Sequence, residues 1–100
     1  MNAKETLAEA VALAPSDAKL FYNLALSYGR LGDYNKAIQT LEKTIEMKPN
    51  YKEARYALAL FLMDEKEFLK AEEQLEYIVI HIDPNDELVK KAVEEINQLQ

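Results

Sequence analysis

Apolar residues follow a helical period along almost the whole of this chain. They recur at spacings of three and four residues, which places them on one face of an α-helix, and polar residues fill the positions between them. The pattern predicts six amphipathic helices, at residues 3 to 14, 17 to 31, 34 to 47, 51 to 65, 67 to 82 and 86 to 99. The fold class that follows is all-α.

The breaks between these segments carry residues that end or begin helices. Pro15, Pro49 and Pro84 stop the pattern, and Gly32 is suited to a helix C-cap. Glu53 is placed three residues after Asn50, where it would complete a capping box with that residue. We expect the helix N-caps at Ser16, Asp33, Asn50 and Asn85.

The central part of the chain repeats after 34 residues. Tyr22, Leu24, Ala25, Leu26, Ala37 and Leu41 recur as Tyr56, Leu58, Ala59, Leu60, Ala71 and Leu75, with one residue inserted before Pro84. Such a period in a helix-turn-helix pattern is typical of stacked antiparallel hairpins. We therefore expect a single domain of 100 residues. It divides into a leading half repeat (1–15), two repeats (16–49 and 50–84) and a closing helix (85–100).

The repeated positions resemble the signature of the tetratricopeptide repeat (TPR) family. The first copy carries it as Leu24-Ala25, Tyr28, Gly32-Asp33-Tyr34, Ala37, Leu41 and Pro49. The second copy is similar to it through Leu58-Ala59, Phe68, Ala71, Leu75 and Pro84. The resemblance implies a TPR-type right-handed superhelix of antiparallel helical hairpins, ended by the closing helix that usually follows such an array.

The chain departs from the family pattern at several positions. Phe21 stands where the family often has a tryptophan, and Arg55 stands at the same place in the second copy, so a core aromatic is missing there. Lys66 replaces the glycine that the first copy has, so the second turn is expected to be less tight. Ile78 replaces a customary alanine and is expected to push its neighbours apart.

Composition and charge exclude several partners. The net charge is −6 and the isoelectric point about 4.8, which argues against nucleic acid, because phosphate backbones need clustered Lys and Arg. No apolar run approaches the roughly 20 residues of a membrane span. No signal peptide is visible. The compartment stays unassigned, with the cytoplasm as the default expectation.

Residues that carry enzymatic chemistry are nearly absent. The chain has no cysteine, and its one histidine, His81, has Tyr77 and Asn85 four residues away on either side, so it has no second metal ligand at helical spacing. There is no phosphate-binding glycine loop and no nucleophile–base pair. We expect no catalytic site, no metal and no cofactor.

The surface with a predicted function is the one made by the first helix of each hairpin, here called the first-helix face. In the family this face is a concave groove, and the resemblance implies that it binds a peptide or a partner helix. Its apolar and aromatic middle suits apolar anchors. Alternatively, Tyr22 and Tyr56 only support the adjacent helices. The candidate partner-binding residues are Lys19, Tyr22, Asn23, Leu26, Arg30, Tyr56, Leu60 and Met63.

One sub-class of the family clamps the C-terminal carboxylate of chaperone peptides with basic residues and asparagines. Lys19 and Asn23 match part of that set, but Glu53 and Ala57 stand where the next repeat would need Lys and Arg. The resemblance therefore argues against carboxylate clamping in this chain.

The main alternative function is structural. The first helix has an apolar face with Leu7, Val11 and Leu13 but lacks the other half of its hairpin, so it is a candidate for self-association into a homo-oligomer. The closing helix, in contrast, is expected to have a fully polar outer side. The chain would then be a spacer or oligomerisation module, or a fragment or engineered piece of a longer TPR protein.

Overall fold

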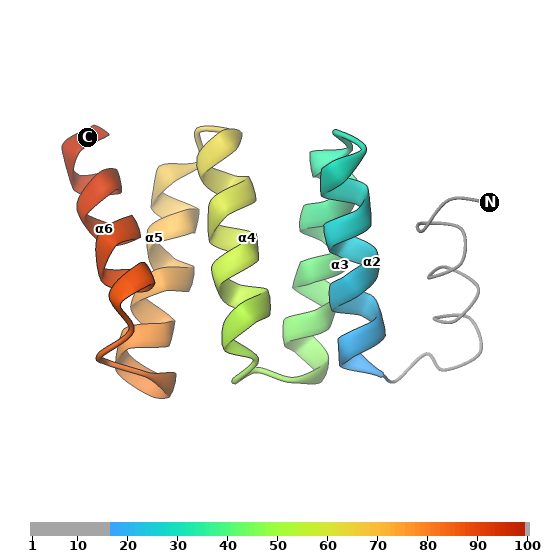
Figure 1. Ribbon diagram of the computed structural model, residues 1–100, viewed down its shortest axis with the longest axis horizontal. Coiled ribbons are helices and arrows are strands. Elements are labelled where there is room, and N and C mark those ends of the chain that lie inside the picture. Colours follow the sequence, from blue (N-terminus) through green and yellow to red (C-terminus); the bar gives the residue numbers. More distant parts are fainter. Residues whose placement is uncertain (1–16, 100) are drawn as a thin grey trace.

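The computed structural model describes residues 17–99, which form a row of helices (Figure 1). These are α2 (Ala18–Arg30), α3 (Tyr34–Met47), α4 (Lys52–Asp64), α5 (Phe68–Tyr77) and α6 (Glu87–Leu99), and a π-helical turn, η1 (Ile78–Ile82), continues α5. The all-α fold class is confirmed. With η1 counted as part of α5, every described helix begins and ends within one residue of its predicted limits. The predicted helix at residues 3 to 14 lies outside the described residues.

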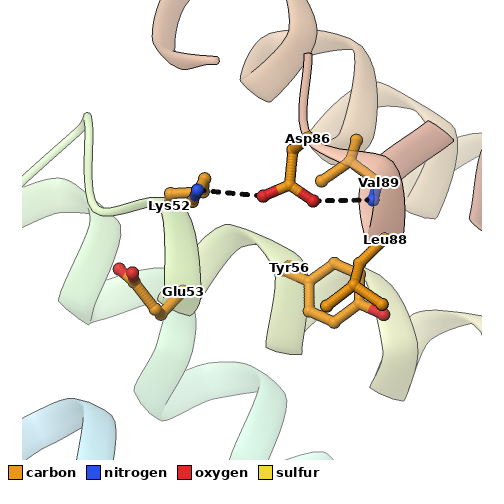
Figure 2. Close-up of a pocket in the computed structure, with 6 residues that line it drawn as sticks. All are labelled: Lys52, Glu53, Tyr56, Asp86, Leu88 and Val89. Carbon is orange, nitrogen blue, oxygen red and sulfur yellow. Dashed lines mark hydrogen bonds and ion pairs between the residues drawn. The ribbon is translucent and has the colours of Figure 1, made fainter. Parts of the chain in front are cut away.

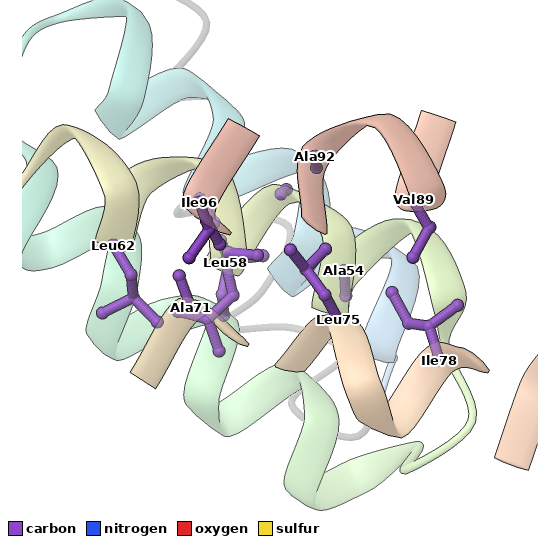
Figure 3. Close-up of a cluster of buried hydrophobic side chains, with 13 residues drawn as sticks. Ala54, Leu58, Leu62, Ala71, Leu75, Ile78, Val89, Ala92 and Ile96 are labelled. Atoms are coloured by element: carbon purple, nitrogen blue, oxygen red, sulfur yellow. The ribbon is translucent and has the colours of Figure 1, made fainter. Parts of the chain in front are cut away.

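Two antiparallel hairpins build the described part of the array. Helix α2 pairs with α3 and α4 pairs with α5, while α3 packs against α4 and α6 packs against α5 (Figure 1). Alanines are completely buried at equivalent positions of both hairpins, Ala25 with Ala59 and Ala37 with Ala71, where a small side chain lets two helices approach closely. Figure 3 shows the main cluster of buried apolar side chains, in which α4, α5 and α6 converge.

Both hairpin turns have the same backbone geometry, which corrects the expectation that the second would be less tight. Gly32 has φ +82° and Lys66 has φ +63°, so both residues are in the left-handed region. The amide after each closes the helix in the same way: Asp33 N donates to Tyr28 O at 3.0 Å, and Glu67 N donates to Leu62 O at 2.8 Å. The repeat packing imposes this turn even where the residue has a side chain.

The Lys66→Gly substitution is expected to stabilise the domain by about 1 kcal/mol, because a residue with a Cβ is strained in the left-handed conformation and glycine is not. Gly32→Ala should destabilise it by a similar amount: the space around Gly32 is open, so the cost comes from the backbone alone. Urea unfolding of both variants measures the effect. Two changes of the same sign would show that φ does not decide stability at these turns.

Aspartates cap three of the described helices, two of them next to the residue predicted to do so. The N-cap of α2 is Asp17, whose side chain accepts from Lys19 N at 3.0 Å and from Leu20 N at 3.3 Å, while the predicted Ser16 lies outside the described residues. At α6 the acceptor for Val89 N is Asp86, at 3.1 Å, rather than Asn85. A carboxylate interacts more favourably than a neutral side chain with the positive end of the helix dipole. The predicted cap at Asp33 is confirmed, since it accepts from Lys36 N at 3.2 Å.

The capping box predicted at the start of α4 does not form. The N-cap residue is Tyr51, and its side chain makes no capping hydrogen bond. The Asn50 side chain instead accepts a hydrogen bond from the Tyr77 hydroxyl at 3.2 Å. A contact with the second helix of the hairpin therefore replaces a local cap.

The inserted residue before Pro84 is accommodated by η1. In this turn Asp83 N donates to Ile78 O at 2.7 Å, a bond that spans five residues rather than four. A π turn adds one residue without ending the helix. Ile78, which was expected to push its neighbours apart, is completely buried at the start of this turn.

Arg55 occupies the interior position where the family has an aromatic residue. Only 9% of Arg55 is exposed, and its guanidinium carbon lies 3.4 Å from the centre of the Tyr77 ring. Its Nε donates to Pro49 O at 2.6 Å and its Nη1 donates to Gln74 Oε1 at 2.8 Å. Burial lowers the pKa of Arg55. A planar cation stacked on Tyr77 thus fills the place of the missing aromatic.

Candidate functional site

The predicted partner-binding residues all lie on α2 and α4, the first helices of the two hairpins. Lys19 and Arg30 are exposed, and Asn23 is half-buried. The apolar members are neither fully buried nor free of the core: Tyr22, Leu26, Tyr56 and Met63 are half-buried and pack against it, and Leu60 is 38% exposed. The first-helix face therefore presents a row of partly accessible apolar side chains.

Tyr22 has a structural contact in addition to its accessible surface. Its ring centre lies 5.2 Å from that of Tyr51, at an interplanar angle of 41°. Burial raises the pKa of Tyr22, and the negative charge of Glu53 raises it further. The pKa of Tyr51 is raised by burial first and then by Tyr22 and Glu53. Tyr22 thus helps to hold α2 against the start of α4, as the alternative interpretation of this residue proposed.

Helices α4 and α6 enclose a pocket on this face (Figure 2). Its volume is about 240 Å³. It is lined by Lys52, Glu53, Tyr56, Asp86, Leu88 and Val89. Tyr56 is the only one of the eight predicted partner-binding residues in this lining; the other seven are elsewhere on α2 and α4. Leu88, an apolar residue in the first turn of α6, is 62% exposed.

An ion-pair network fixes one side of the pocket. Lys52 Nζ lies 3.2 Å from Asp83 Oδ2 and 2.9 Å from Asp86 Oδ2, so it joins the first turn of α4 to the segment that begins α6 (Figure 2). The hydrogen bonds to Asp86 and Asp83 raise the pKa of Lys52. The bonds from Lys52 and from Val89 N lower the pKa of Asp86. This network was not predicted, because Lys52 and the two aspartates are about thirty residues apart in sequence and no local pattern links them.

The Asp86→Asn substitution is expected to lower the melting temperature at pH 7, because the amide keeps a capping oxygen for Val89 N but loses the charge that binds Lys52. A carboxyl group whose pKa is lowered on folding stabilises the protein above its unfolded value, here 3.8, and loses that effect as the pH falls through its folded value. The difference between the two proteins should therefore vanish well below pH 3.8. Melting curves from pH 2 to 8 measure it, and a difference that persists in acid would assign the effect to the cap.

Phe61 closes the other end of the face. Its ring lies against Gly29, where a Cβ atom would collide with it, and its centre is 5.5 Å from that of Tyr34 at an angle of 34°. The absence of a side chain at Gly29 therefore accommodates Phe61 rather than leaving space for a ligand. The accessible apolar surface is the part around Leu60, Tyr56 and Leu88.

Other kinds of site have little support in the described part of the chain. No three His, Cys, Asp or Glu side chains among residues 17–99 are placed to hold a metal ion. None of the described helices is long and apolar enough to cross a bilayer. His81 is exposed in η1, and its ring centre lies 4.5 Å from that of Tyr77.

Comparisons with known proteins agree with this architecture. Residues 18–51 match the family model described as tetratricopeptide repeat. The chain is 31% identical over 93 residues to Hsp70-Hsp90 organizing protein 1 of Glycine max; the match covers 90% of this chain but spans only 16% of that relative.

Two solved structures illustrate how closely the fold is shared. The first TPR of Spaghetti (RPAP3), bound to the HSP90 peptide SRMEEVD, has a TM-score of 0.90 at 17% identity, covering 96% of this chain and 75% of that one. The TPR2B domain of yeast Sti1, in a pHsp70 complex, has a TM-score of 0.87 at 23% identity, covering 98% and 82%. At these identities the likeness establishes the fold.

Proposed function

Because this chain belongs to the tetratricopeptide repeat family, we propose that it is a protein-interaction module that docks a peptide or a partner helix on its first-helix face. The observation that carries the proposal is the row of partly accessible apolar side chains on α2 and α4, which ends in the pocket beside Tyr56. Accessible apolar side chains next to a preformed pocket provide anchor sites for a peptide.

The relatives support this choice of function. The RPAP3 domain is bound to an HSP90 peptide, and a second TPR domain of human RPAP3 is in complex with the HSP70 peptide SGPTIEEVD. These complexes concern those proteins; for this chain they support binding of a peptide as the mode of action. We propose the predicted set as the contact residues, with Tyr56 and Leu60 as the apolar anchors and with Lys19, Asn23 and Arg30 setting the orientation.

We also infer that the chain has no catalytic activity of its own. The support is the lack of a nucleophile–base pair in the sequence and the interaction role of TPR domains. The self-association alternative depends on residues 3 to 14, which lie outside the described residues. It stays a prediction that the solution mass over a range of protein concentrations tests.

Selection of short random peptides on the immobilised domain tests the proposed function. Leu60→Ala should weaken the selected peptides about fivefold or more, as truncation of an interface anchor does. Leu69→Ala is the matched control, because Leu69 is 73% exposed but lies on α5, away from the first-helix face. Peptides that depend on Leu69 and are indifferent to Leu60 would place the binding surface on the wrong side of the array.

A further inference from the structure

We propose that the pocket between α4 and α6 receives an apolar anchor of a peptide whose flanking residues are basic. This inference rests on the proposed function and specifies the chemistry of the ligand. The inner surface is apolar: the Tyr56 ring and the Leu88 side chain lie next to each other, and Val89 lies nearer Asp86 (Figure 2). Polar side chains stand only around the edge, so an aliphatic or aromatic side chain is the occupant that this surface favours.

The charges around the edge are predominantly negative. Lys52 is the one cation of the lining, and it is already bound by Asp83 and Asp86. The Glu53 carboxylate makes no hydrogen bond or ion pair with any described residue. The lining holds one ammonium and two carboxylates, those of Glu53 and Asp86, and the Asp83 carboxylate lies next to the same ammonium, so negative charge is in excess on this side of the apolar pocket. Lys and Arg next to the anchor are the complementary residues, because opposite potentials across an interface select the partner.

Glu53 is placed to bind such a residue. Its side chain leaves α4 in the direction away from Asp86 and Leu88 (Figure 2). Its charge acts on Tyr22 and Tyr51, so it lies where the two hairpins meet. A peptide that inserts an anchor beside Leu88 and continues toward α2 passes this carboxylate. The peptide residue at that place would contact the Glu53 carboxylate, a negative charge that has no partner among the described residues.

The same geometry disfavours an acidic peptide. In SRMEEVD, the peptide bound by the RPAP3 domain, three of the last four residues are acidic. In this chain Glu53 presents a like charge to such a sequence, and Ala57, the other position where a carboxylate clamp needs a cation, is buried. The preferred ligand of this chain is therefore opposite in charge to the peptide that the similar domain binds.

The test selects short random peptides on the wild-type domain and then compares each selected peptide with a copy whose charged residues are reversed in sign. SRMEEVD is a further probe. We expect the selected peptides to carry Lys or Arg next to an apolar residue. Their charge-reversed copies and SRMEEVD should bind about tenfold more weakly at low salt, because attraction to the carboxylates becomes repulsion. Glu53→Gln should weaken the selected peptides about two- to fivefold, the range of an exposed ion pair. Glu46→Gln, an equal change of net charge on α3, should not.

The pocket itself is tested by a pair of variants on one helix. Leu88 and Leu99 are both 62% exposed on α6, but only Leu88 lines the pocket. Leu88→Ala should weaken the selected peptides about fivefold and Leu99→Ala should leave them unchanged. Acidic or charge-indifferent peptides that still depend on Leu60 would overturn this inference and leave the proposed function standing. If the binding of no selected peptide depends on Leu60 or Leu88, both this inference and the proposed function fail.

Discussion

Replacing Leu58 by alanine should lower the free energy of unfolding by about 2 to 5 kcal/mol, the usual range when a large buried side chain is truncated. Leu58 is 1% exposed and lies in the cluster between α4, α5 and α6 (Figure 3). Its removal would leave a cavity in this cluster, whose members are held on separate helices and cannot easily move together to fill it. Urea unfolding measures the effect, provided that the dependence of the free energy on urea stays unchanged.

Leu60→Ala is the control for this prediction. Leu60 is on the same helix, so the substitution changes helix propensity by the same amount, but it points to the first-helix face and is 38% exposed. It should cost less than about 1 kcal/mol, because a partly exposed side chain loses only part of its burial on truncation. Equal losses in the two variants would show that the buried stripe of α4 has been assigned incorrectly. A loss below about 0.5 kcal/mol for Leu58→Ala would show the same.

The helices were predictable because their burial and their ends are local properties of the sequence. The buried positions of α4, such as Ala54, Leu58 and Leu62, repeat every four residues, which is the spacing of apolar residues on one face of a helix. Gly32 and Pro49 mark helix ends for reasons of backbone geometry that hold in any context. These signals place every described helix to within one residue.

The caps were less predictable, because adjacent residues offer the same chemistry. Ser16 and Asp17, like Asn85 and Asp86, are neighbouring residues that both suit an N-cap, and the choice between them depends on charge and on the path of the chain. At Asn50 a tertiary contact decides: its side chain binds the Tyr77 hydroxyl, which lies 27 residues away in sequence. Local sequence does not contain that information.

The pocket could not be predicted in detail for a related reason. Tyr56 was recognised from its place in the repeat, but the pocket also needs α6 to be held at a particular distance from α4 by Lys52, Asp83 and Asp86. Leu88 shares the apolar stripe of α6 by sequence, but α6 is covered mainly by α5, so Val89, Ala92 and Ile96 are buried and Leu88 is left at the edge. The exposure of Leu88 depends on which helices pack against α6, and a local pattern does not contain that information.

Arg55→Ala is expected to cost about 2 to 4 kcal/mol, although an arginine at this position looks like a defect in the family pattern. The substitution removes two partly buried hydrogen bonds from a charged donor, to Pro49 O and to Gln74, and leaves both acceptors without this partner. It also removes the cation from the face of Tyr77. The main-chain bond matters most, because Pro49 lies in the segment between α3 and α4 and Arg55 thereby holds the connection between the two hairpins.

Three further variants separate these contributions. Arg55→Lys keeps the charge but lacks the planar group that binds two acceptors and stacks on a ring, so it should lose at least half of the stability that Arg55→Ala loses. Combining Arg55→Ala with Tyr77→Leu should cost about 0.5 to 2 kcal/mol less than the sum of the single changes, because the stacking is lost only once. Arg30→Ala, at an exposed position of α2, should change stability by less than about 0.5 kcal/mol. If the losses of stability in the single variants add up to the loss in the double variant, the stacking on Tyr77 is contradicted. If Arg55→Ala loses no more stability than Arg30→Ala, the guanidinium contributes nothing to the core.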